Sequence, residues 1–193
     1  VDDGKANAMG PSLIESIEAS LDQAERDRLA VVLAGREGRF SAGFDLNVMK
    51  EGGAAGRAMV VAGGRLSVRL GRHPGPVVAA CTGHAVAMGA VLLMSSDWRV
   101  GTRGPFKIGF NEVAIGMTTP LFLLEQARER MSKRHFLRAT VQAQIYDPET
   151  AVDHTGLSRP FSYSRRLSDS CPFVPPNRPA NTRLAPFVHA SDC

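Results

Sequence analysis

Residues 29–46 read LAVVLAGREGRFSAGFDL. The first six form a short, continuously apolar run, which is typical of a parallel strand buried on both faces. A glycine-bearing loop over 35–43 follows, and Asp45 is then placed to cap a short helix through Lys50. A strand, a glycine turn and a helix start leave backbone N–H groups pointing outward, where they can hold an anion or a developing oxyanion. Taken alone, the turn also fits a plain connection between two elements.

The same arrangement recurs later in the chain. Residues 77–81 (VVAAC) predict a second buried strand, and small residues after it lead into a helix predicted over 87–95. Small side chains let a ligand approach the backbone, and the N-terminus of a helix favours negative charge through its dipole. One such turn is weak evidence, but two of them, each after a buried strand, predict a pair of N–H donors for one oxyanion.

The remaining sequence alternates between predicted helices and strands. Ser12 and Glu15 have the S-x-x-E form of a capping box, so Ser12 is predicted to cap a first helix that the polar run 22–28 ends. Periodicity and turn signals predict helices over 54–72, 120–130, 132–142 and from 147 until Gly156, and a strand over 98–100. Strands that alternate with helices indicate an α/β fold.

The composition is that of one globular domain, with 44% apolar and 22% charged residues in a chain of 193. The net charge is +4, but residues 154–193 contain five arginines and two aspartates and so account for +3 of it. The body of the chain is close to neutral, and no nucleic-acid partner is expected.

The cysteines and histidines do not follow a metal-site pattern. Cys81, Cys171 and Cys193 lack C-x-x-C spacing and cannot make a disulfide framework, and the five histidines lack ligand spacing, so no metal site is predicted. Cys81 lies in an apolar strand and is predicted to be an inert core thiol. No apolar run reaches 18 residues, so no membrane span or membrane partner is expected. Without a signal-peptide pattern after Val1, a cytoplasmic location is expected.

Residues 157–193 differ in composition from what precedes them. They contain six of the twelve prolines, many serines and arginines, and no helical or strand periodicity. We expect an irregular, poorly ordered segment, and we divide the chain into a core over 1–156 and a tail over 157–193. A reading-frame shift in a GC-rich gene is our hypothesis for the abrupt change.

Glu112 is set among apolar neighbours in the stretch NEVAIGM, residues 111–117. A carboxylate in such surroundings tends to have a raised pKa and can serve as a general acid or base. The alternative is an ordinary glutamate on an exposed loop.

Four stretches, taken together and in this order, resemble the crotonase superfamily, the enoyl-CoA hydratase/isomerase group. They are DGKANA at 3–8, FSAGFDL at 40–46, GHAVAMGA at 83–90 and NEVAIGM at 111–117. The resemblance covers the core and implies an α/β fold, a crotonase (ClpP-like) spiral of ββα units that is incomplete here at both ends. It also implies an acyl-CoA substrate, no separate cofactor because coenzyme A is part of that substrate, and a homo-trimer or hexamer for the intact protein.

The resemblance assigns roles to the two glycine turns. It implies oxyanion-binding N–H groups at Ala42 and at Met88, where many family members have glycine. Gly43, Phe44 and Asp45 would complete the loop that binds the thioester. Asp45 is also a candidate for a second catalytic carboxylate, although the helix-capping role is favoured.

The catalytic carboxylates are where this sequence departs from the family pattern. Hydratases of the family hold a water molecule between two glutamates; Glu112 matches one of them, and Val91 occupies the position of the other. A single glutamate is enough to move a proton between carbons, as the enoyl-CoA isomerases of the family do. We therefore expect an enoyl-CoA hydratase/isomerase-like enzyme with Glu112 as its acid/base and Lys5 alongside the CoA. The alternatives are a non-catalytic acyl-CoA-binding protein and an inactive truncated crotonase.

Overall fold

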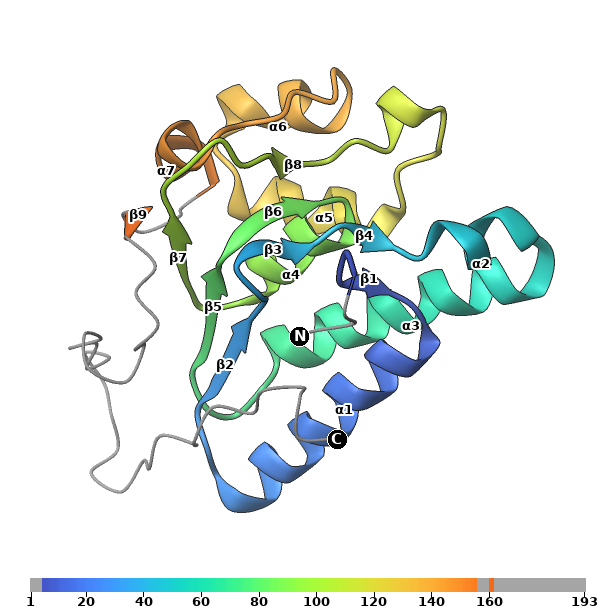
Figure 1. Ribbon diagram of the computed structural model, residues 1–193, viewed down its shortest axis with the longest axis vertical. Coiled ribbons are helices and arrows are strands. Elements are labelled where there is room, and N and C mark those ends of the chain that lie inside the picture. Colours follow the sequence, from blue (N-terminus) through green and yellow to red (C-terminus); the bar gives the residue numbers. More distant parts are fainter. Residues whose placement is uncertain (1–4, 156–159, 162–193) are drawn as a thin grey trace.

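The computed structural model describes residues 5–155 and 160–161 (Figure 1). In chain order the elements are β1 (Ala8–Met9), α1 (Pro11–Asp27), β2 (Val31–Ala34), β3 (Gly38–Ser41), β4 (Gly43–Phe44), α2 (Leu46–Glu51), α3 (Gly53–Gly71), β5 (Val77–Cys81), β6 (Gly83–Val86), α4 (Met88–Ser95), β7 (Trp98–Thr102), β8 (Ile108–Gly109), the 3-10 turn η1 (Val113–Ile115), α5 (Leu121–Arg130), α6 (Lys133–Thr140), α7 (Pro148–Thr155) and β9 (Pro160–Phe161).

The strands of the described residues form three parallel sheets. The larger sheet has the order β2-β5-β7-β9, the second has the order β3-β6-β8, and β1 pairs with β4 alone. Each pass of the chain adds one strand to the larger sheet, the next strand to the smaller sheet, and then helical structure (Figure 1). This is the predicted spiral of ββα units, and the predicted α/β fold class is confirmed.

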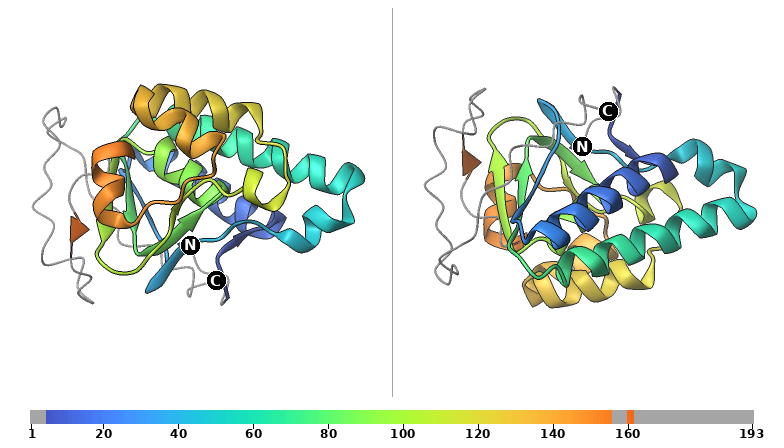
Figure 2. Two further views of the ribbon diagram at one scale, coloured as in Figure 1. Left: turned by 90° about the horizontal axis from the view of Figure 1, so that it is seen from above. Right: turned by 90° about the horizontal axis from the view of Figure 1, so that it is seen from below.

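Helix α4 lies at the centre of the molecule. All eight of its residues are buried, and it contacts α3, α5 and β6. Helices α1 and α3 lie side by side on one flank, as Figure 2 shows from below. The guanidinium group of Arg69 on α3 joins them through ion pairs with Asp22 and Glu25 on α1. The start of α4 is therefore held between sheets and helices.

The first helix begins differently from the prediction. Its N-cap is Gly10, its first residue is Pro11, and no side chain caps it, so the prediction of Ser12 as the cap is wrong. Proline fits the first helical position because its missing N–H would have no partner in the helix. The helix also continues through the polar run to Asp27, because Leu21 and Ala24 keep its inner face buried.

Three short strands lie in segments that were expected to be loops or turns. The predicted loop over 35–43 contains β3 and the start of β4, and the small residues before α4 form β6. These strands are specified by pairing: Gly38 faces Gly83, and a Cβ added at Gly83 would overlap the Gly38 carbonyl. Only glycine allows the two backbones to approach so closely.

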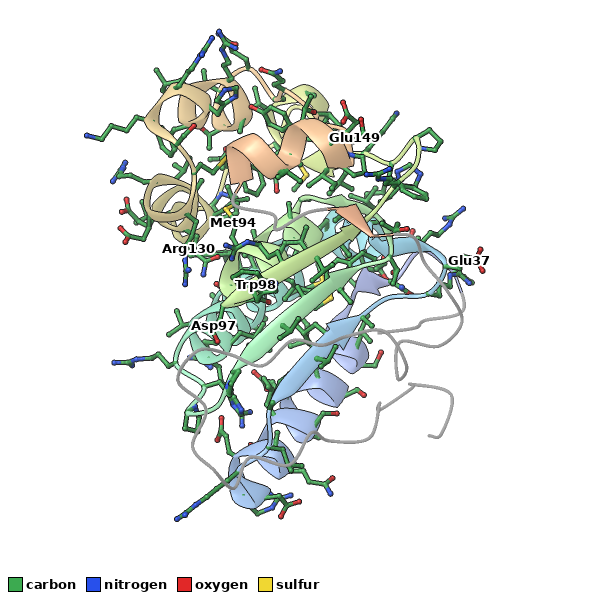
Figure 3. The ribbon with its side chains drawn as sticks, turned by 90° about the vertical axis from the view of Figure 1, so that its left-hand side faces the viewer. Glu37, Met94, Asp97, Trp98, Arg130 and Glu149 are labelled. Carbon is green, nitrogen blue, oxygen red and sulfur yellow. The ribbon has the colours of Figure 1, made fainter. Side chains whose placement is uncertain are left out.

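The larger sheet carries exposed side chains on its strands β2 and β7. The prediction that the strand over 29–34 is buried on both faces is wrong: β2 is an edge strand, and Val32 is 40% exposed. Trp98 on β7, labelled in Figure 3, is equally exposed, and the register Val32–Val78–Trp98 places both side chains on the same face of the sheet. The strand predicted over 77–81 is confirmed as β5, and the one predicted over 98–100 extends to Thr102.

The predicted tail over 157–193 lies outside the described residues except at Pro160 and Phe161. These two residues were expected to be irregular, but they form β9, paired with Gly101 and Thr102 of β7. Within the part of the chain that the structure describes, no helix is long and apolar enough to cross a membrane.

Candidate functional site

The two glycine turns predicted to carry N–H donors lie against each other. A Cβ added at Gly43 would be 2.6 Å from the Cβ of Ala87, 3.1 Å from the Val86 carbonyl oxygen and 3.4 Å from the nitrogen of Met88. A Cβ added at Gly89 would be 2.5 Å from the Ser41 carbonyl oxygen. The structure therefore brings the thioester loop and the start of α4 into direct contact.

Met88 is the first residue of α4, so no carbonyl one helical turn earlier is available to accept its N–H. No side chain caps this end, and the helical ladder begins with the Val91 N–H donating to the Ala87 carbonyl at 3.2 Å. Ala87 has φ 51° and ψ −122°, a conformation that costs a non-glycine residue about 1–3 kcal/mol. This strained conformation occurs where the chain turns from β6 into α4. Because residue 87 is alanine and not glycine, the sequence alone does not predict a positive φ at this position.

The N–H of Ala42 is already engaged. It donates to the Ala6 carbonyl at 3.1 Å, an engagement that disfavours Ala42 as an oxyanion donor. Ser41 Oγ donates to the Asn7 carbonyl at 2.8 Å and accepts from the Gly43 N–H at 3.3 Å. These bonds tie the loop to the segment that leads into β1. Because β1 is only two residues long, the sequence alone gave no sign of this pairing.

Asp45 caps α2, as predicted. Its Oδ1 accepts from the Asn47 N–H at 2.8 Å, and this engagement leaves Asp45 a poor candidate for a second catalytic carboxylate. The half-buried ring of Phe44 packs against α3 at Gly63, and the buried side chain of Met88 reaches the same glycine. Lys5 is exposed near the start of the described residues.

Glu112 is buried, with only 7% of its surface exposed, so the alternative of an exposed loop glutamate is excluded. Its carbonyl accepts from the N–H groups of Ile115 and Met117 at 3.2 and 2.8 Å, which fixes the backbone at the start of η1. Within the described residues, its Oε2 has no hydrogen-bond partner. Burial raises the pKa of Glu112, and hydrogen bonds from the backbone N–H groups of Glu112 and Asn111 oppose that rise in part. A buried carboxyl of this kind suits proton transfer.

Two other residues behave as packing residues. Val91 is completely buried in α4, three residues after Met88 and so on the same face of the helix. Burial also raises the pKa of the Cys81 thiol to about 12, and the residue lies in the core, as predicted. Among the described residues, no group of three or more histidines, cysteines or acidic residues could hold a metal ion.

The raised pKa of Glu112 predicts a pH dependence of stability. The folded protein binds this proton more tightly than the unfolded chain does, so the favourable contribution is complete below the ordinary value of 4.5. It is lost as the pH rises through the raised pKa of the folded state. We expect the free energy of unfolding of the wild type, relative to Glu112→Gln, to fall over this range and then level off. Urea unfolding of both proteins at a series of pH values measures the difference between their free energies of unfolding. A difference that does not change with pH contradicts a raised pKa of Glu112 in the folded protein.

A spiral of parallel ββα units, with a glycine loop packed against the first turn of a central helix, defines an α/β protein of the crotonase type. The chain belongs to the enoyl-CoA hydratase/isomerase family, whose model matches residues 2–161. The match ends five residues beyond the predicted core boundary at 156, and it includes β9.

Individual relatives agree with this assignment. An enoyl-CoA hydratase/isomerase family protein from Pseudomonas syringae is 43% identical, with a TM-score of 0.81 over 84% of this chain and 74% of that one. An enoyl-CoA isomerase from Mycobacterium tuberculosis is 40% identical, with a TM-score of 0.80 over 84% and 71%. A putative enoyl-CoA hydratase from Thermus thermophilus is 36% identical over 62% of this chain, which spans 49% of that protein's length. The chain thus spans about half the length of this curated relative.

Proposed function

We propose that this chain acts on acyl-CoA thioesters as an enoyl-CoA hydratase/isomerase, with isomerisation as its main reaction. The observation that carries the proposal is the contact between the Gly43 loop and the start of α4, where a Cβ added at Gly43 would lie 3.4 Å from the Met88 nitrogen. Relatives named as hydratases and as isomerases both match the chain, so family membership alone does not choose between the reactions.

The first donor in this proposal is Phe44 in place of Ala42. Neighbouring N–H groups of a paired strand point to opposite sides of that strand. The Asp45 N–H donates to the Met9 carbonyl of β1 at 3.3 Å, so the Phe44 N–H is directed away from β1. The preceding residue, Gly43, lies against Met88. Phe44 and Met88 would then donate together to a thioester oxygen.

The mechanism assigns one task to each group. The two N–H groups stabilise the negative charge that develops on the thioester oxygen, and removing one such donor commonly costs about 10²–10³-fold in rate. Glu112 takes a proton from the α-carbon of a 3-enoyl-CoA and returns it to the γ-carbon, which moves the double bond to the 2-position. Glu112 therefore ends the reaction in the protonation state in which it began, and no second acid or base is needed.

Hydration requires a second acid/base group that the proposed site lacks. Adding water to a double bond requires a base for the water and an acid for the α-carbon. Val91 has no group for either task, and the Asp45 carboxylate is engaged with the Asn47 N–H. We therefore place hydration below isomerisation.

The test is a pair of assays on the chain: isomerisation of a 3-enoyl-CoA and hydration of crotonyl-CoA. The expected result is measurable isomerisation with slower hydration. Absence of CoA-dependent turnover would overturn the enzyme assignment. Calorimetric binding of a non-reactive thioester without turnover would instead support the non-catalytic acyl-CoA-binding alternative.

Other expectations also remain proposals. They are the position of Lys5 alongside the CoA, the division into a core over 1–156 and a tail over 157–193, a cytoplasmic location, and assembly into trimers or hexamers. Size-exclusion chromatography tests the assembly, and aggregation in place of a defined oligomer would favour the inactive alternative.

A further inference from the structure

We propose that Gly63 on α3 is a positioning residue for the oxyanion hole, an inference that rests on the proposed function. A Cβ added at Gly63 would lie 2.5 Å from Cζ and 2.6 Å from Cε1 of Phe44, and 3.4 Å from Cε of Met88. The side chains of both proposed N–H donors therefore meet at one glycine of a neighbouring helix.

The contact is suited to fixing a backbone position. Phe44 has a rigid ring with two side-chain torsions, and its ring atoms lie where the first atom of any side chain at Gly63 would have to be. The clashing atoms are at the far end of the ring, but Met88 Cε lies at the same glycine, and β4 is two residues long and held to β1 by the Asp45–Met9 bond; in this proposal the push is passed to β4 instead of being absorbed by rotation of the ring. A methyl group at Gly63 would thus displace Phe44 together with its N–H.

Glycine at this position is otherwise unfavourable. Residue 63 lies in the interior of the nineteen-residue helix α3, where alanine is a better helix former than glycine. The close approach of Phe44 supplies a reason for glycine that helix formation does not. Because catalysis depends on geometry at the sub-ångström scale, the same approach sets the position of the donor pair.

The adjacent Gly64 offers a matched control. It lies in the same helix, but a Cβ there would meet the ring of Phe122 on α5, 3.1 Å from Cδ1, and no atom of β4 or α4 is among its nearest neighbours. Gly63→Ala and Gly64→Ala therefore make the same chemical change and gain the same helix propensity, while only the first pushes on a proposed donor.

The experiment compares the wild type with Gly63→Ala, Gly64→Ala, Phe44→Leu and the Gly63→Ala/Phe44→Leu double variant. Misplacing a catalytic group by about 1 Å costs up to roughly 100-fold, so we expect Gly63→Ala to lower kcat for isomerisation by about 10–100-fold with little change in KM. Gly64→Ala should stay close to the wild type. Leucine keeps the N–H of residue 44 but removes the two ring atoms that obstruct the methyl group. The effect of Gly63→Ala should therefore be much smaller in the Phe44→Leu background.

A second measurement separates this inference from the proposed function. Acetoacetyl-CoA forms an enolate whose near-ultraviolet absorbance reports stabilisation by the N–H pair without turnover. If the wild type binds it as the enolate but shows no isomerisation, the proposed activity fails; the inference still stands if Gly63→Ala weakens the band and Gly64→Ala does not. Equal kcat values and equal bands in the two glycine variants overturn the positioning role, even if Gly63→Ala lowers Tm. A wild type with neither turnover nor enolate band overturns both proposals.

Discussion

Glu112→Gln is expected to reduce isomerisation of a 3-enoyl-CoA by about 10²–10⁴-fold, the usual contribution of a positioned acid/base. Glutamine has nearly the same shape as glutamate but cannot take a proton from the α-carbon and return it to the γ-carbon. Because the thioester oxygen is held by backbone N–H groups in this mechanism, KM should change little. Steady-state kinetics on both proteins measure the two parameters separately.

The matched control for this variant is Glu149→Gln. Glu149 is an exposed residue of α7 and is labelled at the surface in Figure 3. The same chemical change there should leave kcat and KM at wild-type values. Turnover that is insensitive to Glu112→Gln would remove Glu112 from the mechanism, whatever the control shows.

Gly83→Ala should cause the largest loss of stability, which we expect to be about 3 kcal/mol or more in the free energy of unfolding. The added Cβ would overlap the Gly38 carbonyl and also crowd the Arg39 nitrogen. Both are backbone atoms of the paired strand β3, so no side-chain rotation can relieve the overlap. The β3–β6 pairing, which carries the loop to the site, would have to shift.

Gly71→Ala is the corresponding control. A Cβ at Gly71, the last residue of α3, has no atom within 4 Å, so the change should be neutral or stabilise by up to about 1 kcal/mol. Urea unfolding gives both free energies. A Gly83→Ala protein with the wild-type midpoint would contradict the close strand approach.

Local signals were enough to predict part of the structure. The strand over 77–81 follows from a continuous apolar run with β-branched residues, and the Asp45 cap follows from the tendency of aspartate to accept a backbone N–H two residues later. Both features depend on residues close to one another in the chain. The burial of Glu112 was also predicted, but its apolar neighbours Val113 and Ile115 are themselves exposed, so those neighbours do not account for it.

The features that were missed depend on distant residues. Strand β4 exists because it pairs with β1, and β6 because it pairs with β3, some 45 residues earlier in the chain. The same long-range pairing engages the Ala42 N–H with the Ala6 carbonyl. A periodicity pattern needs several residues to be detected, and these strands have two to four.

The central position of α4 determines where this scaffold can acquire new chemistry. All eight of its residues are packed core residues, so most substitutions there will be lost to misfolding before they can alter a reaction. The segment that follows Glu112 differs from α4 in its packing. Its 3-10 turn carries the exposed residues Val113 and Ile115, where substitutions disturb fewer core contacts. Laboratory evolution toward another acyl-CoA reaction should therefore accumulate changes around residues 111–117 and leave α4 almost untouched.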